Sequence, residues 1–307
     1  MKIAVTGGSG FIGTNLVKHL SKKHEVRILD KKIPLIKNIQ FIKGSVIDPK
    51  NVQNIVKDTE YVIHLAAILG VKKTEDNPLK TLKINIEGTK NVLEACRKFD
   101  VKKIIFSSSS EVYGEPQKIP ISEDDQLYPK SCYGISKLVC EEYIKAYHKT
   151  YGLSFTILRY FNVYGPEQRT EFVIPQFVKL ALSNKSLTIY GNGNQIRAFT
   201  YVDDAIRGTI LTLEKGDNEI FNIGNDREPI KIKELAKKIL TLTKSKSKLV
   251  FIPMEKSDRI ESREIHHRIP KINKAKSILG YVPIVSLNEG ILNVIKNFKG
   301  IKNENIS

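Results

Sequence analysis

The sequence predicts an α/β fold, in which a doubly wound parallel sheet carries a smaller α+β lobe. Two observations lead to this prediction. Short β-branched runs alternate with amphipathic segments through the first half of the chain, and a glycine-rich turn follows the first of these runs. Such alternation is typical of a parallel sheet covered by helices on both faces. Ligands of these sheets bind beyond the carboxyl ends of the strands, so we expect the functional residues to follow strands.

The expected elements can be taken in chain order. The first-half strands are KIAVTG, HEVRIL, IQFIKG, EYVIHLAA, VKKIIFSSS and SFTILRYFN. The helix-like segments between them are Phe11–Ser21, Pro78–Lys98 and Ser131–Thr150. After Gly165 come helical EFVIPQFVKLALSN, strand-and-turn SLTIYGNGNQ, helical TYVDDAIRGTILTLEK, the strand NEIFNIG and the amphipathic helix KIKELAKKILTLTK. We expect a dinucleotide-binding domain over 1–165, to which 198–224 returns, and a mainly substrate-binding lobe over 166–307.

Length and composition suit a globular chain of one large domain with a smaller lobe. The 307 residues are 41% hydrophobic and 27% charged. The three cysteines, Cys96, Cys132 and Cys140, have no zinc-site spacing, and their odd number argues against a disulfide framework. The first apolar run is shorter than a signal-peptide core, and no run reaches membrane-spanning length. The sequence therefore predicts a cytoplasmic protein with no metal site and no membrane partner.

The charge balance raises nucleic acid or an anionic substrate as a partner. Lys and Arg total 50 against 33 Asp and Glu, a net charge of +17. The lysines are spread along the chain, however, and neither zinc-finger spacing nor an RNP-type aromatic segment accompanies them. Solvated helix faces explain this pattern better than nucleic-acid binding. A non-catalytic protein that binds a nucleotide or nucleic acid remains the alternative class.

The glycine-rich turn KIAVTGGSGFIG predicts a dinucleotide site. Gly7 permits a tight turn, Gly10 lets a pyrophosphate approach the backbone, and Gly13 allows close packing of helix on strand. The N-terminus of the following helix supplies free N–H donors for the phosphates. The strand before the turn and the helix after it are the context that a Rossmann fold requires.

Asp30 favours NAD over NADP. It ends the second expected strand, where a carboxylate can bind both ribose hydroxyls of the adenosine half. The same carboxylate would repel a 2′-phosphate. Lys31 and Lys32 weaken this preference, because they would attract that phosphate.

Tyr133 and Lys137 are candidates for proton transfer. They lie four residues apart in SCYGISKLVCEEYIKAY and therefore share one helical face. A phenol with a pKa near 10 is a poor base at neutral pH. A neighbouring ammonium and a cationic nicotinamide ring would both favour the phenolate, so Tyr133 could take a hydroxyl proton while the ring takes the hydride. Lys137 could also hold the nicotinamide ribose.

Seven motifs in order resemble those of one enzyme group. They are TGGSGFIG, HLAA, INIEGT, SSSSEVYG, YGISK, LRYFNVYGP and GNGNQIRAFTYVDD. Together they resemble the extended short-chain dehydrogenase/reductase superfamily, and within it the NAD-dependent nucleotide-sugar epimerases and dehydratases typified by UDP-glucose 4-epimerase. The similarity spans about the whole chain. It implies a Rossmann fold, tightly bound NAD, a nucleotide-diphosphate sugar as substrate, and a homodimer through Pro78–Lys98 and Ser131–Thr150.

The resemblance also implies residue roles. Ser109 would hydrogen-bond the reacting sugar oxygen beside Tyr133 and Lys137, Ser107 would lie near the nicotinamide, and Ser110 and Glu111 would face the sugar or support the loop. Ser108 has a blander explanation, namely that it satisfies backbone groups beyond the strand. The implied cofactor contacts are Gly7, Gly10, Phe11, Ile12, Asp30, Lys31, Ser45, Val46, Leu65, Ala66, Ala67, Asn85, Ser107, Tyr133, Lys137 and Tyr160.

One of the implied residue roles departs from the family pattern, and one cannot be assigned to a single residue. Ser45 stands where an acidic residue often meets the adenine, so Ser45 or Asp48 would have to replace it. On the substrate side, Asn162 and Arg197 match positions that grip the diphosphate, where an Arg–phosphate pair is strong. A further phosphate-binding arginine falls in SDRIESREIHHRIPKINKAK, where Arg259 and Arg263 are both candidates.

The fate of a 4-keto sugar distinguishes the possible reactions. A 4-epimerase returns the hydride to the other face, whereas a 4,6-dehydratase needs an Asp-Glu pair where this chain has Ser110-Glu111. A UDP-glucuronate decarboxylase is the stronger rival, because His267, Arg268, Pro270 and Ile272 match its HRxPxI stretch and Arg268 could meet a sugar carboxylate. YGISKLVCEEY and the short loop PISEDDQLYPKS favour the epimerase. We therefore predict C4 epimerisation of a UDP-glucose/UDP-galactose type substrate, with decarboxylation or another NAD-dependent nucleotide-sugar conversion as the alternative.

Overall fold

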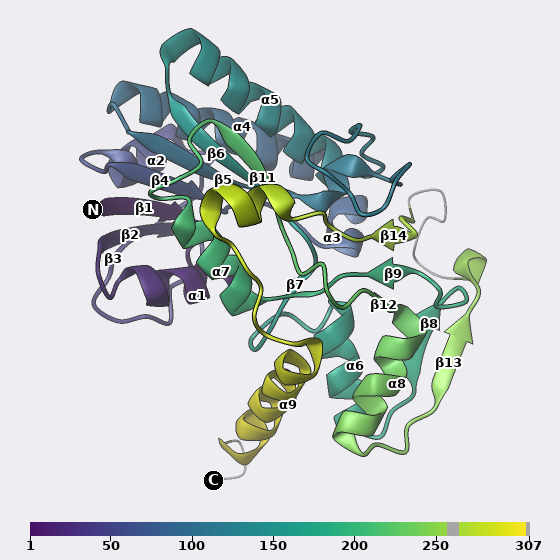
Figure 1. Cartoon of the computed structure of the whole chain (residues 1–307). Coiled ribbons are helices and arrows are strands. Elements are labelled where there is room, and N and C mark those ends of the chain that lie inside the picture. Colours follow the sequence, from purple (N-terminus) through teal and green to yellow (C-terminus); the bar gives the residue numbers. More distant parts are fainter. Residues whose placement is uncertain (257–263, 305–307) are drawn as a thin grey trace.

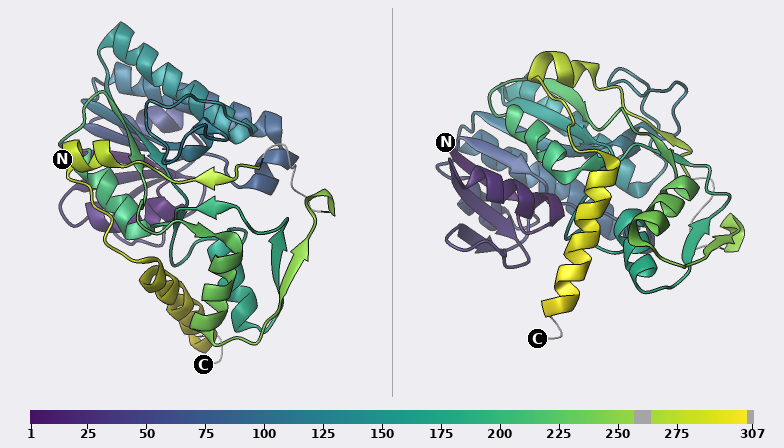
Figure 2. Two further views of the ribbon diagram at one scale, coloured as in Figure 1. Left: turned by 45° about the vertical axis from the view of Figure 1, so that its right-hand side comes forward. Right: turned by 60° about the horizontal axis from the view of Figure 1, so that its bottom comes forward.

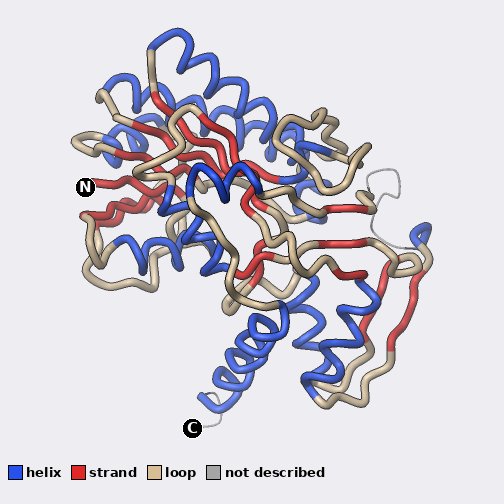
Figure 3. The backbone as a smooth tube through the Cα atoms, viewed as in Figure 1, coloured by secondary structure: helices blue, strands red, loops and turns tan. Residues whose placement is uncertain are grey.

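Repeated βα units build the first half of the molecule. The computed structural model describes residues 1–256 and 264–304. Of the expected site residues, Arg259 lies outside the described residues, as does its alternative Arg263. Strands gather in one layer of the upper part of the molecule, and helices lie on both sides of it (Figures 1 and 3).

The central sheet has seven strands in the order β11-β6-β5-β4-β1-β2-β3. All neighbouring strands are parallel. The strands are β1 (Lys2–Thr6), β2 (Glu25–Asp30), β3 (Gln40–Lys43), β4 (Tyr61–His64), β5 (Lys103–Ser109), β6 (Ser154–Tyr160) and β11 (Glu219–Ile223). The order reverses direction between β1 and β4, and the crevice for a ligand lies beyond the carboxyl ends of these strands. The predicted doubly wound sheet is confirmed.

Successive side chains along a strand point to opposite faces of the sheet and pack into two separate hydrophobic cores. In β1, Ile3 and Val5 join the core that contains α1 and α7, whereas Ala4 joins the core under α2, α4 and α5. This period of two is what a sheet covered on both faces requires. The covering helices are α1 (Phe11–Leu20), α7 (Val202–Leu211), α2 (Pro49–Val56), α4 (Pro78–Lys98) and α5 (Cys132–Tyr151).

Local chemistry sets the ends of α5, the helix that carries Tyr133 and Lys137. The Ser131 side chain accepts the backbone N–H of Gly134 and so caps the first turn, as serine favours at this position. Gly152 ends the helix in the left-handed region at a φ of 73°. Capping and termination therefore fix α5 at both ends, with its functional side chains in the first two turns.

The rest of the chain forms the lobe at the lower right of Figure 1 and several short strands. The lobe holds α6 (Val173–Leu182), β8 (Leu187–Tyr190), α8 (Ile232–Thr243), β13 (Leu249–Ile252) and α9 (Leu287–Glu304). The short strands are β7 (Val163–Tyr164), β9 (Ile196–Arg197), β10 (Thr200–Tyr201), β12 (Ile230–Lys231) and β14 (His267–Arg268). The remaining short helices are α3 (Val71–Asp76), η1 (Ser110–Tyr113), η2 (Met254–Lys256) and η4 (Ala275–Leu279).

The short strands matter because they join distant segments. β9 lies between β12 and β14, so that Arg197 and Arg268 are register partners. β10 pairs with β7 beside the end of β6. Figure 2 shows α9 running away from the sheet along the outside of the lobe. The sequence patterns did not identify these two-residue strands, since two residues carry no periodicity, and they also missed α2, α3 and α9.

None of the helices among the described residues is long and apolar enough to cross a membrane.

Candidate active site

The turn between β1 and α1 forms a bare backbone cradle. Gly7 has a φ of +76°, and a Cβ there would lie 2.7 Å from the backbone nitrogen of Ala66. A Cβ on Gly13 would lie 2.2 Å from the carbonyl oxygen of Gly7, so only glycine fits at either position. No side chain caps the first turn of α1, where Phe11 and Ile12 stand. The cradle leaves the helix N-terminus open to an anionic group, as pyrophosphate binding requires.

Asp30 is held in a fixed orientation at the end of β2. Its two carboxylate oxygens accept the backbone N–H groups of Ser9 and Lys32, each at 3.0 Å. The Ser9 contact ties the carboxylate to the glycine turn. Asp30 therefore stands beside the phosphate cradle.

A cavity of about 540 Å³ opens next to Asp30. It is lined by Lys31, Ser45, Ile47, Asp48, Lys80, Lys83 and Ile84. The sequence predicted Lys31 and Ser45, and it offered Asp48 as a substitute. In the structure the Asp48 side chain caps α2 by accepting the N–H of Lys50 at 2.9 Å. Lys80, Lys83 and Ile84 come from α4 and were missed, because nothing in their spacing relates them to β2. Val46 is buried against Gly88.

Asn85 hydrogen-bonds the segment that follows β4 and also Ser136 of α5. Its Oδ1 accepts the N–H of Ile68 at 2.8 Å, and its Nδ2 donates to the Ile68 carbonyl at 3.2 Å and to Ser136 Oγ at 2.9 Å. These bonds hold the Leu65–Ala67 segment, which follows β4, between α4 and α5. The Tyr160 hydroxyl pairs with Thr209 Oγ1 of α7 at 2.6 Å. Both residues thus have their polar groups engaged by the protein.

These residues fit a dinucleotide. A glycine cradle that any Cβ would fill, a fixed carboxylate at the end of β2 and an adjoining cavity follow one another along the strand ends. Among the described residues, no cluster of three or more His, Cys, Asp and Glu side chains could hold a metal ion.

The serines at the end of β5 have four different environments. The Ser107 carbonyl accepts a bond from Lys137 Nζ at 2.6 Å. The Ser108 hydroxyl donates to Glu141 Oε1 at 2.5 Å, so it binds a carboxylate instead of backbone groups. Ser109 Oγ accepts the N–H of Glu111 at 3.2 Å and also hydrogen-bonds the Tyr133 side chain. Ser110 is buried.

Tyr133 lies on the first turn of α5, next to Ser109 at the end of β5. Burial raises the pKa of the Tyr133 phenol, and the Glu111 carboxylate raises it further, while the bond with Ser109 and the charge of Arg268 lower it. We expected the Lys137 ammonium to make this phenol acidic. That expectation also requires the cationic nicotinamide ring and stays a prediction; in the protein alone, Lys137 Nζ lies 5.7 Å from the centre of the Tyr133 ring and donates to the Ser107 carbonyl.

The pKa of Lys137 is also shifted from its ordinary value. Its side chain is buried, with Nζ 4.7 Å from the centre of the Phe106 ring, and burial lowers its pKa to about 8. The ammonium is therefore still the main form at pH 7, but it is a far stronger acid than an exposed lysine.

Glu111 and Arg268 meet next to Tyr133. Glu111 Oε2 accepts the Ser131 hydroxyl at 2.7 Å, and its Oε1 lies 3.3 Å from an Arg268 terminal nitrogen. The Arg268 side chain is 15% exposed. Its Nε is buried and has no hydrogen-bond partner in the part of the chain that the structure describes. The ion pair with Glu111 thus places one cation of the C-terminal half just beyond the carboxyl end of β5.

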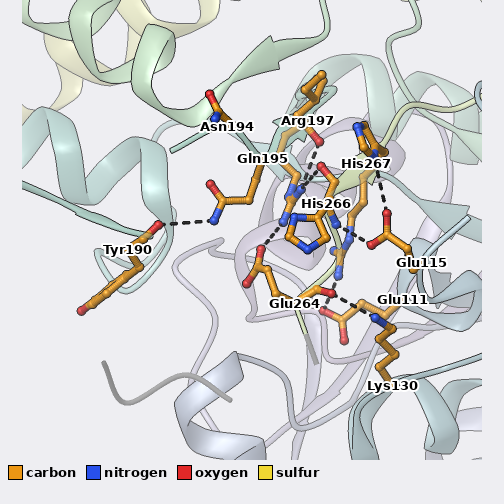
Figure 4. Close-up of polar contacts among 12 residues, drawn as sticks. Glu111, Glu115, Lys130, Tyr190, Asn194, Gln195, Arg197, Glu264, His266 and His267 are labelled. Carbon is orange, nitrogen blue, oxygen red and sulfur yellow. Dashed lines mark hydrogen bonds and ion pairs between the residues drawn. The ribbon is translucent and has the colours of Figure 1, made fainter. Parts of the chain in front are cut away.

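Arg197, on the strand next to β14, lies in a cluster of charged residues that includes Glu264, Lys130 and Glu115 (Figure 4). A terminal nitrogen of Arg197 contacts Glu264 Oε1 at 2.7 Å, and the Glu264 carbonyl accepts from Lys130 Nζ at 3.2 Å. Glu115 accepts the backbone N–H of His266 at 2.6 Å. Sequence reasoning named Arg197 but missed Glu264, Lys130 and Glu115, which only the β9–β14 pairing brings near it.

Asn162 lies between β6 and β7 with a φ of 40°, a conformation that asparagine tolerates better than most residues. Its Nδ2 donates to the Ala198 carbonyl at 3.0 Å. This bond joins the segment after β6 to the residue that follows Arg197, so the two expected diphosphate contacts are held on adjacent segments.

Comparison with known proteins shows similarity over the whole chain. The model of the NAD dependent epimerase/dehydratase family matches residues 3–224. A UDP-N-acetyl-alpha-D-glucosaminuronate decarboxylase of Bacillus cytotoxicus is 39% identical over 318 residues, which cover 98% of each chain. The structure of UDP-glucose 4-epimerase from Thermotoga maritima with UDP-glucose superposes with a TM-score of 0.92 at 36% identity, covering 98% of this chain and 100% of that one. UDP-glucuronic acid 4-epimerase from Bacillus cereus, in complex with UDP-glucuronic acid and NAD, has a TM-score of 0.90 at 34% identity, covering 98% and 100%.

Proposed function

This chain belongs to the NAD dependent epimerase/dehydratase family, and from that premise we propose that it epimerises a UDP-linked hexose at C4 through a transient 4-keto sugar. The observation that carries the proposal is the convergence of Ser109, Tyr133 and Lys137 at the carboxyl end of β5, beside the dinucleotide cradle. Solved relatives at 34–36% identity are 4-epimerases with UDP-sugars bound.

Tyr133 is the group that takes the proton from the sugar hydroxyl and returns it. Its raised pKa keeps the phenol protonated in the protein alone and makes its phenolate a strong base, while Ser109 and the cation of Arg268 act in the opposite direction and favour the phenolate. NAD, when bound, supplies the acceptor that removes and restores the hydride at C4. Lys137, anchored on the Ser107 carbonyl, presents an ammonium on the same helical face.

Substrate binding uses the other side of the crevice. We assign the diphosphate to Arg197 and Asn162, because a guanidinium forms strong charge-assisted bonds with phosphate. Residues 1–165, with 198–224, would hold NAD, and the remainder of 166–307 would mainly hold the substrate. The three free cysteines, of which Cys96 and Cys140 are buried, support a cytoplasmic location.

Replacement of Tyr133 by Phe tests the assignment. Loss of a positioned acid–base group is expected to lower turnover of UDP-glucose to UDP-galactose roughly 10³-fold. NAD content and UDP binding should stay near wild-type values, because the ring remains. Tyr151→Phe, at the far end of α5, is the matched control and should be fully active. Near-normal turnover of Tyr133→Phe would refute the role of the phenol.

Decarboxylation of a nucleotide-linked uronic acid is the second candidate, and one observation favours it. Arg268 presents a largely buried guanidinium, with Nε unpartnered among the described residues, next to Glu111 and close to Tyr133. Such a group suits a sugar carboxylate. The Bacillus cytotoxicus relative is a decarboxylase.

One experiment separates the two reactions. The protein is incubated separately with UDP-glucose, UDP-N-acetylglucosamine and UDP-glucuronate, and products are followed by NMR and by release of carbon dioxide. A galacto isomer without carbon dioxide supports the epimerase. If UDP-glucuronate releases carbon dioxide and the other two UDP-sugars are not converted, the decarboxylase replaces the epimerase as the proposed function. Arg268→Leu should then abolish the release of carbon dioxide.

We also propose that two copies associate through α4 and α5. These helices lie side by side on the outside of the sheet (Figure 1). They expose Leu79, Ile135 and Tyr151, at 82%, 42% and 55%. Light scattering coupled to size-exclusion chromatography tests this: wild type should elute as a dimer and Leu79→Lys with Tyr151→Lys as a monomer. A monomeric wild type would refute it.

A further inference from the structure

A buried ion pair lies directly behind the catalytic residues. Glu141 follows Lys137 by one turn of α5 and is fully buried. Its Oε1 accepts the Ser108 hydroxyl at 2.5 Å and Arg159 Nε at 3.1 Å, and its Oε2 accepts an Arg159 terminal nitrogen at 2.7 Å. Ser108 and Arg159 are themselves register partners in β5 and β6. One carboxylate therefore ties the catalytic helix to both strands.

Arg159 extends this network towards the substrate side. Its other terminal nitrogen donates to the Tyr113 hydroxyl at 2.9 Å, and the Tyr113 hydroxyl donates to Asn222 Oδ1 at 2.7 Å. Asn222 Nδ2 then donates to the Ile121 carbonyl at 3.0 Å. The connection runs from α5 through β6 and η1 to β11 and the loop that contains Ile121.

That loop is joined to the segment carrying Arg268. Ile121 donates its N–H to the Ile269 carbonyl and accepts the N–H of Lys271, both at 2.7 Å. Ile269 immediately follows Arg268, the cation that faces Glu111 and Tyr133. The network thus begins one residue from Ser109 and ends one residue from Arg268.

Stability alone gives no reason for such a pair. Removing two charges from water costs several kcal/mol per ion, and well-packed apolar residues of the same volume are often at least as stable. What a fully satisfied buried network provides is a unique geometry, since every member has a specific partner and direction. Here the members come from the elements that carry Ser109, Tyr133 and Arg268.

We propose that the Glu141–Arg159 pair is a positioning centre with two branches, one through Ser108 that sets Ser109 against Tyr133 and one through Tyr113 that sets Arg268 against the substrate. The inference rests on the proposed function of Ser109 and Tyr133. Neither Ser108 nor Tyr113 touches substrate in this scheme, so both are positioning residues. The two branches make different kinetic predictions.

Ser108→Ala cuts the first branch and leaves both Glu141–Arg159 bonds in place. A small displacement of the Ser109 hydroxyl from the reacting oxygen is expected to lower kcat roughly 10- to 100-fold with little change in KM. Ser108→Thr restores a hydroxyl and should recover most of the lost kcat. Replacing Glu141 directly is avoided, because it would leave a buried arginine unpaired and endanger folding.

Tyr113→Phe cuts the second branch and keeps the ring. With Arg268 less well placed, KM for the UDP-sugar is expected to rise about tenfold while kcat falls less than threefold, because the Ser109–Tyr133 pair is untouched. Thr156→Val is the matched control: it removes another buried hydroxyl, bonded to the Gly216 carbonyl at 2.7 Å, from the far end of β6. It should change neither constant.

Steady-state kinetics of the four variants, with NAD content and thermal melting measured alongside, test the proposal. A kcat loss for Ser108→Ala, its recovery in Ser108→Thr and a KM rise for Tyr113→Phe support it. Two results would overturn it. In the first, Ser108→Ala and Tyr113→Phe lower the melting temperature but have the same kcat and KM as Thr156→Val. In the second, each of these two variants changes kcat and KM together, so that the two branches have no separate effects. Wild type that converts none of the UDP-sugars would instead refute the proposed function.

Discussion

The buried ammonium of Lys137 should make the stability of the protein depend on pH in a measurable way. Lys137 is 2% exposed, and burial lowers its pKa from 10.5 to about 8. The unfolded chain therefore binds one more proton than the folded chain between these two pH values. Since stability rises with pH wherever the unfolded state holds more protons, the cost of the buried charge is full below about pH 8 and disappears above pH 10.5.

The size of the effect follows from the two pKa values. At about 1.4 kcal/mol for each tenfold change in the protonation equilibrium, the full cost of the charge is roughly 3 kcal/mol. Between pH 7 and pH 10 about 2.5 kcal/mol of it is removed, because both protonation equilibria are then partly shifted. The variant Lys137→Met keeps a similar chain length and has no charge to bury.

The assay is chemical denaturation of cofactor-free protein, since bound NAD would add its own charge beside Lys137. The chain has no tryptophan, so far-UV circular dichroism is the appropriate signal. The free energy of unfolding is measured for wild type and Lys137→Met at several values between pH 7 and pH 10. The wild type should gain about 2.5 kcal/mol relative to the variant across this range.

Taking the difference removes the pH-dependent contributions of the other titratable groups, which both proteins share. The exposed Lys149, on the same helix, provides the control. Lys149→Met makes the same substitution at an exposed position of this helix. Parallel curves for wild type and Lys137→Met would refute the reasoning and show that Lys137 keeps an ordinary pKa.

Two further predictions concern the cofactor site. Asp30→Ala should weaken NAD binding about tenfold and reduce the preference for NAD over NADP, because the repulsion of a 2′-phosphate is removed while Lys31 stays. Dissociation constants of both cofactors, measured by calorimetry, check this. An equal loss of affinity for NAD and NADP would contradict it. Gly7→Ala should abolish soluble folded protein, because its Cβ would lie 2.7 Å from Ala66 at a φ of +76°. Gly152→Ala, at a φ of +73° with nothing within 4 Å of the added Cβ, should cost only about 1–2 kcal/mol in denaturation; equal losses in both variants would show that the close contact is unimportant.

Local sequence determined the parts of the site that depend on short spacings. The glycine turn, Asp30 and the pair Tyr133–Lys137 each lie within one strand–turn–helix unit or one helical turn, where backbone geometry relates neighbours directly. The β-branched runs likewise determined the central sheet, because burial on both faces demands them. The role of Ser109, by contrast, was implied only by the resemblance of SSSSEVYG to the family motif.

Tertiary structure alone decided the contacts between distant segments. The pairing of β9 with β14, which brings Arg268 beside Arg197, rests on two-residue strands without any periodic signal. The serine at position 108 had no visible partner in the sequence, since Glu141 reaches it only when α5 packs on β5. The pKa of Tyr133 depends on tertiary contacts in the same way: spacing places Lys137 on its helical face, but burial and the Glu111 carboxylate raise the pKa of the phenol in the protein alone.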